Sequence, residues 1–226
     1  MIVMKLRQFY EDLQDRWAGS LVKVQYLDHP HAKEYMYRLA REGLVENVAW
    51  GWYWVPAQLE DVWDFLANDK NFKVIAGQTA ASLWNGDFVH RELYLVKVKD
   101  RSYGQALKAF GEGKGWDLEV EVARKPPAYT KIDGLLVETI DETILDCLSR
   151  WAFLDAFAIL HEHPEIDFRT VAKQGYWQRL PGTHIRLKPV LEYGYSRLTG
   201  RKSRPLADPF VAREVEEAVE KVMEIG

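Results

Sequence analysis

The sequence has one cysteine, no long apolar run and no marked excess of one charge, and each shortage excludes a class of protein. Cys147 alone excludes an intramolecular disulfide and a zinc site built from several cysteines. No apolar run approaches the roughly 18 residues that a membrane-spanning helix requires, and the residues from Met1 to Lys5 form no apolar signal-peptide core. We therefore expect a protein of a reduced, cytoplasmic compartment that is not exported and has no membrane partner.

Charge and aromatic content are those of an ordinary globular protein. The 30 Lys and Arg residues face 34 Asp and Glu residues, which gives a net charge of −4. This global charge gives no reason to expect binding to nucleic acid, so such a function must come from a local patch. The 9 Trp, 11 Tyr and 9 Phe residues supply core material and argue against disorder. The 226 residues allow one large domain or two small ones.

The first 57 residues have the pattern helix, short strand, helix, β-hairpin. Apolar residues at helical spacing predict a helix over 4–17, and an apolar, β-favouring stretch predicts a strand over 21–24. Start and stop signals predict a second helix over 30–42. A hairpin is predicted over 44–55. This is the order of a winged helix, a helix-turn-helix with a hairpin appended, although many small α+β units share it.

Residues 58–139 predict a mixed sheet with short helices. A strand that is apolar on both faces belongs in the centre of a sheet, which fits 92–99. Strict alternation of apolar and acidic residues predicts a half-exposed strand over 116–122. The glycine-rich segment 111–115 lacks the spacing of a phosphate-binding loop and is interpreted as a turn. The other predicted elements are helices over 59–66, 78–84 and 103–110 and short strands over 74–76 and 134–137.

The last third of the chain is predicted to be helical at both ends and rich in loops between them. Thr139 and Glu142 have the spacing of a capping box, so a helix should begin there and continue to about 162. The stretch 167–209 is interpreted as loop-rich. A final helix, acidic outside and apolar inside, is predicted over 209–224.

Three motifs follow one another between about residues 20 and 160. The first combines 39–44 with the Gly-Trp-Tyr-Trp-Val-Pro segment 51–56, the second is 74–86, and the third is 134–148, with its Asp-Glu-Thr-Ile-Leu-Asp run. In order and spacing they resemble the AbiEi family of antitoxins, described as winged-helix transcriptional regulators of type IV toxin–antitoxin systems.

The resemblance implies an α+β fold with two domains. The first is a winged helix-turn-helix over 1–57, and the second is a mixed α/β domain with a C-terminal helix over 58–226. Within the second, 58–163 match the AbiEi core, and 164–226 are a basic, loop-rich stretch with the terminal helix. The resemblance also implies DNA-binding transcriptional regulation and a cognate toxin protein as partner. It implies no catalytic residue, no cofactor and no metal site.

The outward face of the predicted helix 30–42 carries groups that suit DNA. Lys and Arg meet phosphates or guanine edges, and His or Tyr reach bases. A solvated helix face is the other interpretation, because residues 1–57 contain seven basic and seven acidic residues, whereas DNA-binding domains are usually clearly basic. A homodimer would set the spacing of two DNA half-sites. The candidate residues for double-stranded DNA are His31, Lys33, Tyr37, Arg38 and Arg41.

Trp50, Trp52 and Trp54 alternate along the hairpin, so they should project to one face, with Tyr53 on the other. Packing against the second domain is the favoured interpretation. A dimer interface is a second, because exposed aromatic patches mark contacts. Insertion into a minor groove or stacking on single strands is a third.

The stretch 173–204 is the most charge-biased part of the chain, with Glu192 as its single acid and with aromatic residues between the cations. Such a mixture can hold a nucleic-acid backbone and stack bases. It could equally neutralise an acidic face, either that of Glu119 and Glu121 or that of the last helix. The candidate residues for a second nucleic-acid or partner patch are Arg179, Arg186, Lys188, Arg197, Arg201, Lys202 and Arg204.

Two alternatives to a DNA-binding regulator stay open. One is a protein-interaction module whose winged helix does not bind DNA, which the neutral charge and the Trp-rich hairpin favour. The other is an enzyme of nucleotide or phosphate chemistry that uses Asp133, Glu138 and Asp141, which should then converge in a pocket with perturbed pKa values. The pair His161 and His163 is not predicted to bind metal, because positions i and i+2 do not share a helix face.

Overall fold

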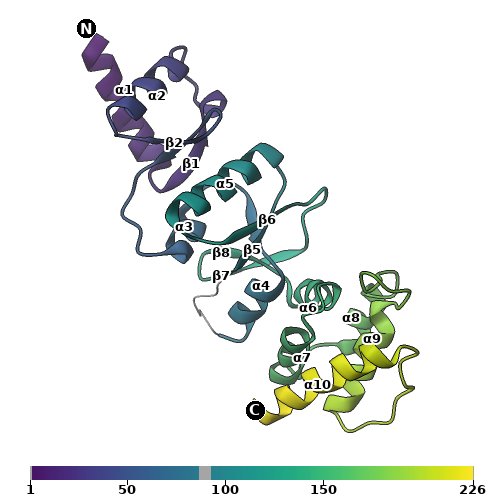
Figure 1. Cartoon of the computed structure of the whole chain (residues 1–226). Coiled ribbons are helices and arrows are strands. Elements are labelled where there is room, and N and C mark those ends of the chain that lie inside the picture. The colour runs from purple at the N-terminus through teal and green to yellow at the C-terminus, as the bar shows by residue number, and fades with distance from the viewer. Residues whose placement is uncertain (1, 87–92, 226) are drawn as a thin grey trace. The chain divides into compact units, whose positions relative to one another are not determined.

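A computed structural model describes residues 2–86 and 93–225 and shows a mixed α+β chain (Figure 1). The chain divides into two compact units. Unit 1 comprises Met1–Val74, Glu92–Pro126 and Asp133–Leu135, and unit 2 comprises Ile75–Arg91, Pro127–Ile132 and Leu136–Gly226. The described residues form ten α-helices and two sheets, and the last element is a helix. The α+β class and the C-terminal helix therefore agree with the sequence prediction.

The N-terminal part of unit 1 has the predicted order of helix, strand, helix and hairpin, with a short 3-10 helix before the second helix. β3 pairs antiparallel with both β1 and β2, which gives a three-stranded sheet in the order β1-β3-β2. The elements are α1 (Ile2–Trp17), β1 (Ser20–Lys23), η1 (Val24–Tyr26), α2 (Ala32–Arg41), β2 (Glu46–Ala49) and β3 (Trp52–Val55).

The central strand β3 is covered on both faces, because successive side chains point to opposite sides of a strand. Tyr53 faces a core that α1 and α2 supply, where Phe9 and Met36 are buried. On the other face, the indole of Trp52 donates a hydrogen bond of 2.7 Å to Ser102 Oγ. These contacts hold the hairpin between two layers of helices.

The second sheet has five strands in the order β6-β5-β4-β8-β7. β5 lies between two neighbours and runs parallel to β6, so its position inside the sheet confirms the prediction from its two apolar faces. The predicted start of this strand at Glu92 lies outside the described residues. β7 was not predicted. The strands are β4 (Lys73–Ile75), β5 (Tyr94–Val98), β6 (Leu118–Val122), β7 (Tyr129–Ile132) and β8 (Leu135–Glu138).

Two helices cover parts of unit 1, α3 (Val62–Asn68) and α5 (Arg101–Lys114). The side chain of Asp61 caps α3, and that of Asp100 caps α5. The prediction of a turn over 111–115 was wrong, because α5 continues to Lys114 and ends at Gly115 in a left-handed conformation. A glycine costs about 1 kcal/mol in a helix relative to alanine, but a Cβ at Gly111 would lie 2.6 Å from Leu118 Cδ1. Close packing on β6 therefore outweighs the weak helix propensity.

Unit 2 is largely helical, and two predictions made for it were wrong. A single helix was predicted from Thr139, but the structure has two. The helical conformation is interrupted at Trp151, which has a φ of +62°. Thr139 occupies the N-cap position, but its side chain makes no capping hydrogen bond. The stretch interpreted as loop-rich contains two further helices. The helices of this unit are α4 (Gly77–Trp84), α6 (Ile140–Ser149), α7 (Phe153–Glu162), α8 (Phe168–Gln174), α9 (Leu187–Leu198) and α10 (Pro209–Ile225).

The core of unit 2 lies among α6, α7, α9 and α10. Gly194 of α9 allows one close approach, because a Cβ there would lie 2.0 Å from Cζ of Phe157. The buried positions Val190, Leu191 and Gly194 have helical spacing, but they stand among charged and aromatic residues. Because of that mixture, the apolar periodicity of this segment is weak, and the sequence did not predict the helix.

Candidate nucleic-acid interface

Helix α2 has one buried face and one exposed face. Ala32, Tyr35, Met36 and Leu39 are buried on the side of the core. The five candidate residues for DNA all lie on the solvent side of this helix or at its start, which is the arrangement that a recognition helix requires. They are His31, Lys33, Tyr37, Arg38 and Arg41.

One carboxylate, that of Glu34, changes the charge of this exposed face. Its Oε1 lies 2.7 Å from Nη2 of Arg38, and its Oε2 lies 4.0 Å from Nδ1 of His31. Lys33 and Arg41 have no carboxylate within ion-pair distance among residues 2–86 and 93–225. The face therefore offers two open cations and one that is already paired.

Aromatic rings fix the start of α2. The rings of His29 and Tyr35 have centroids 5.0 Å apart, and the ring of Phe9 lies 5.3 Å from that of Tyr35. The backbone N–H of His31 donates a hydrogen bond of 3.1 Å to Nδ1 of His29. Packing, rather than a side-chain cap, therefore sets the entry of the chain into this helix.

The hairpin that follows α2 ends in an exposed tryptophan. Trp50 lies in the turn rather than on β3, and 99% of its surface is exposed. Gly51 beside it has a φ of +73°, which favours glycine. Trp52 and Trp54 are buried instead, and the ring centroid of Trp54 lies 4.7 Å from that of Phe110 on α5. The three residues proposed as one interface thus divide into two that pack inside unit 1 and one in solvent.

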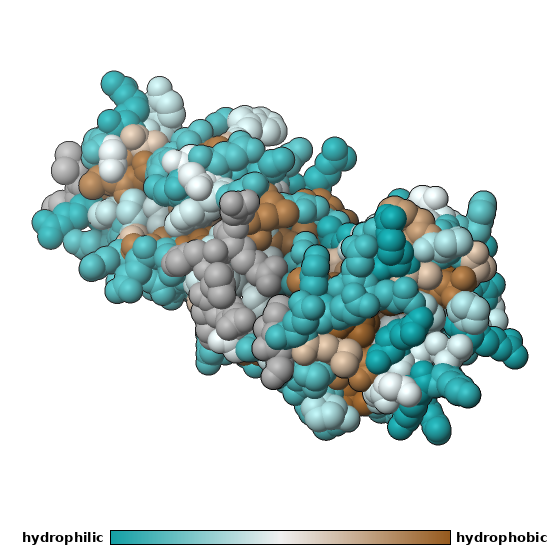
Figure 2. Space-filling view, turned by 60° about the horizontal axis from the view of Figure 1, so that its bottom comes forward, coloured by the Kyte–Doolittle hydropathy of each residue, from teal (hydrophilic) through white to brown (hydrophobic). Residues whose placement is uncertain are grey.

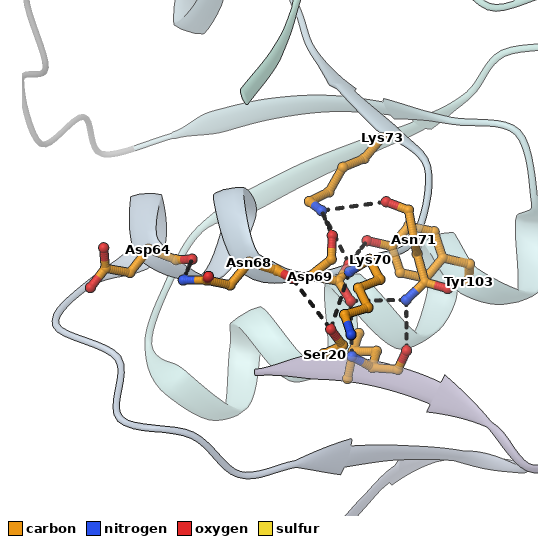
Figure 3. A network of polar contacts seen from close by, with 9 residues as sticks. Ser20, Asp64, Asn68, Asp69, Lys70, Asn71, Lys73 and Tyr103 are labelled. Carbon is orange, nitrogen blue, oxygen red and sulfur yellow. Dashed lines mark hydrogen bonds and ion pairs between the residues drawn. The ribbon is translucent and has the colours of Figure 1, made fainter. Parts of the chain in front are cut away.

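A buried polar network joins β1 to the connection between α3 and β4 and to α5 (Figure 3). Asp69 accepts hydrogen bonds from the backbone N–H of Leu21 at 2.9 Å and from the hydroxyl of Tyr103, and Nζ of Lys73 lies 3.2 Å from its Oδ2. Burial lowers the pKa of Lys73, although Asp69 opposes that shift. Burial and the Asp69 carboxylate raise the pKa of Tyr103 well above its usual value.

This network is structural rather than catalytic. The side chains of Asp69 and Lys73 are 0% and 6% exposed, so a substrate cannot reach them. Asn71 joins the network to β1, because its Nδ2 donates hydrogen bonds to Oδ1 of Asp69 at 2.9 Å and to the carbonyl of Leu21 at 2.6 Å. Sequence patterns do not reveal this network, because Asp69 to Asn71 resemble an ordinary polar turn.

The basic stretch of unit 2 borders a groove with a volume of about 960 Å³, between α8, α9 and the loop after α9. Figure 2 shows that hydrophilic side chains cover most of the face drawn there, with hydrophobic ones between them. Arg169, which lies outside the basic stretch 173–204, also lines the groove. We call the groove lined by Arg169, Arg186, Arg201, Lys202 and Arg204 the basic groove.

The other basic residues of this stretch lie outside the basic groove or are paired. Arg197 forms an ion pair with Glu216 of α10, and Lys188 lies 3.3 Å from Glu192. Arg179 is exposed, and its backbone forms a β-bridge with that of Arg186. Neutralisation of the acidic last helix therefore accounts for Arg197 but for none of the cations of the basic groove.

The carboxylates considered for catalysis have separate structural positions. Glu138 is fully buried, and its Oε2 accepts a hydrogen bond of 3.0 Å from the backbone N–H of Gly77. Asp141 lies in the first turn of α6, where a negative charge is favoured. Asp133 lies in the turn between β7 and β8. Within the described part of the chain, no group of three or more His, Cys, Asp or Glu residues is placed to hold a metal ion.

None of the helices in the described ranges is long and apolar enough to cross a membrane. Comparisons with models of known protein families and with curated proteins find no match to this chain. The resemblance to the AbiEi antitoxins therefore rests on the three motifs alone.

Proposed function

We propose that the chain is a non-catalytic, DNA-binding transcriptional regulator whose residues 2–55 form a winged helix. The order of elements supports this proposal, because α1, β1, α2 and the β2–β3 hairpin follow one another as in a winged helix. The sheet order β1-β3-β2 gives further support, since it places the hairpin beside the first strand. In this proposal η1 occupies the position of the helix that precedes the recognition helix.

The observation that carries the proposal is the exposed face of α2. Its ten residues form a rod about 15 Å long, which fits a major groove about 12 Å wide. Its inner face packs on the same core as β3, so the helix and the hairpin are held together. Phosphate contacts would come from Lys33, Arg38 and Arg41, and base contacts from His31 and Tyr37.

The small number of cations sets the expected strength of binding. Each neutralised phosphate of duplex DNA contributes about −0.9 to the slope of log affinity against log salt. Three contacts from α2 therefore give a slope of about −3. Such a protein binds random duplex DNA weakly and needs a specific sequence or a second copy for tight binding.

The test is binding of the full chain to fluorescein-labelled random duplex DNA, followed by anisotropy over a salt series. The variant Arg38→Ala/Arg41→Ala should reduce the salt slope by about 2, because two phosphate contacts are lost. The control is Lys108→Ala/Arg124→Ala, which removes two exposed cations from unit 1 outside α2.

A loss of binding in the Arg38→Ala/Arg41→Ala variant alone would support the proposal. An equal loss in both variants would mean that only the general charge of the protein matters. No binding of the native chain even at low salt would contradict the proposal.

A second candidate function is a protein-interaction module, and a surface pocket favours it. A cavity of about 300 Å³ lies between α1 and α2, where Leu6, Tyr10 and Leu39 form part of its lining with Leu44. Tyr37 and Leu44 are exposed nearby on the same chain segment. A homodimer, or the cognate toxin that the AbiEi resemblance implies, would be the partner. Light scattering of native protein and Leu44→Glu would test the dimer, which the charged side chain should dissociate.

A further inference from the structure

We infer that the basic groove of unit 2 binds single-stranded nucleic acid, with phosphates in the groove and a base stacked on Trp177 at its edge. This is a second binding activity, distinct from the proposed binding of duplex DNA by α2. The inference rests on the charges of the groove, on the aromatic surface beside it, and on the one side chain that belongs to both.

The cations of the basic groove come from three segments, and four of the five have no carboxylate partner among the described residues. Arg169 belongs to α8, Arg186 precedes α9, and Arg201, Lys202 and Arg204 belong to the loop after α9. No carboxylate of the described residues lies within ion-pair distance of the last four.

Such an assembly of like charges is unusual in a chain with a net charge of −4. The groove contains one carboxylate, Glu192, which already lies beside Lys188. Mutual repulsion of the cations makes the empty groove unfavourable, and a run of phosphates would relieve that repulsion. The chemistry of the groove therefore fits a ligand that carries several negative charges in a row.

An aromatic surface lies directly beside the groove. Trp177 is 79% exposed, and its ring packs edge-on against that of Tyr176 with centroids 4.7 Å apart. The guanidinium of Arg186 lies 4.7 Å from the Tyr176 ring and 5.3 Å from the Trp177 ring. Arg186 also lines the groove, so the cationic and aromatic surfaces are continuous.

This combination favours a single strand over the other phosphate ligands. A base can stack on an exposed indole only when its own face is free, which is the case in a single strand but not inside a duplex. Phosphates of the same strand then follow the cations of the groove. The groove volume of about 960 Å³ is at the upper end of the range for small-molecule pockets, and its cations are spread over three segments. Both features fit an extended strand better than a single small phosphate compound.

The test uses the full chain and a fluorescein-labelled single strand of about 12 thymidines, a length within the usual site sizes. Binding is measured by anisotropy over a salt series. The variant Arg201→Ala/Lys202→Ala/Arg204→Ala should reduce the salt slope by about 2, at about 0.7 per lost phosphate contact. Trp177→Ala should weaken binding at least about fivefold and leave the slope unchanged, because it removes stacking but no charge.

The matched control is Lys108→Ala/Arg213→Ala/Lys221→Ala, which removes three cations outside the groove and should bind like the native chain. Thermal unfolding of each variant shows whether it is folded. The inference is overturned if the control loses as much affinity as the groove variant. It is also overturned if Arg38→Ala/Arg41→Ala abolishes binding of the single strand, or if the native chain does not bind the strand at low salt. A third contrary result would be that the Arg38→Ala/Arg41→Ala variant, in which α2 no longer contributes, binds duplex DNA or inorganic tripolyphosphate as tightly as the single strand.

Discussion

At the scale of single residues, Glu34 controls how much positive charge α2 presents. Its carboxylate pairs with Arg38 at 2.7 Å, on the face proposed to meet DNA. Because an exposed pair of this kind contributes little to stability, Glu34 can be replaced without unfolding the helix. Its effect should instead appear in the affinity for polyanions.

The substitution Glu34→Gln should strengthen binding to duplex DNA with little change in the salt slope, because Arg38 then meets its phosphate without first leaving a carboxylate partner. The same salt-series measurement checks this. Glu112→Gln on α5 removes an equal charge from an exposed position of unit 1 and should have little effect. If both substitutions strengthen binding equally, α2 is not the DNA contact.

Tyr103 is a second residue with a measurable role, through the pH dependence of stability. Its pKa is raised well above the usual 10.0 by burial and by Asp69, so the folded state keeps the phenolic proton more tightly than the unfolded state. The unfolded state therefore binds fewer protons above about pH 10, and the free energy of unfolding should fall as the pH rises through that range. Below pH 10 this contribution is fully present.

Replacement of Tyr103 by Phe should lower the free energy of unfolding by about 1.5–3 kcal/mol near pH 7, the usual value of a hydrogen bond to a charged group. The variant should also lose part of the alkaline decrease, since it has no proton to release. Urea unfolding of both proteins at pH 7 and above pH 10 measures both effects. An identical alkaline decrease in both proteins would show that Tyr103 is not its source.

At the scale of elements, α5 offers a matched pair of glycines. Both Gly111 and Gly113 lie inside the helix, where alanine is intrinsically more stable by about 1 kcal/mol. A Cβ at Gly113 meets nothing within 4 Å, whereas one at Gly111 meets Leu118. Gly113→Ala should therefore stabilise unit 1 by up to about 1 kcal/mol, and Gly111→Ala should destabilise it. Thermal unfolding of the two variants decides this, and stabilisation by both would disprove the close approach of α5 to β6.

The same helix shows what the sequence can and cannot predict. The periodicity of apolar residues located α1, α2 and α10, because each of them buries one regular face. It failed at 111–115, where the need for glycine comes from Leu118 on a later strand. It also failed at Trp151, whose positive φ breaks one predicted helix into two.

The candidate sites were predictable to different degrees, because some are built from one helix and others from segments far apart in the sequence. The exposed residues of α2 follow from the spacing of its buried ones. The sequence predicted a basic patch that includes Arg186, Arg201, Lys202 and Arg204, but it did not predict the groove or Arg169, which stands outside the charged stretch. The network around Asp69 was equally invisible, since its partners lie in β1, α5 and β4.

At the scale of the whole molecule, the first 57 residues do not contain all the cover that their sheet requires. Trp52 and Trp54 are buried, and α5 supplies contacts to both. Trp→Ala substitutions in a core cost about 3–5 kcal/mol each, and a whole domain is stable by only about 5–15 kcal/mol. The free energy lost when both Trp side chains are exposed is therefore comparable with the total free energy of unfolding of a domain.

A fragment of residues 1–57 should consequently lack a cooperative thermal transition, whereas a fragment of residues 1–126, which includes α3 and α5, should retain one. Circular dichroism during heating measures the transition, and the emission of buried tryptophan gives a second signal. A sharp transition in the shorter fragment would show that α1 and α2 alone stabilise the sheet.

The burial of Trp52 and Trp54 against α5 also limits how such a gene could be rearranged in evolution. A recombination event that cuts after codon 57 would transfer the helix α2 and its hairpin without the helix that shields the other face of the sheet. The recipient protein would have to provide a new apolar surface at once, or it would acquire a segment prone to aggregation. The segment that can be exchanged as a folding unit is therefore the longer one that ends beyond α5. A ribosome must accordingly synthesise about twice the length of the apparent N-terminal domain before this unit is able to fold.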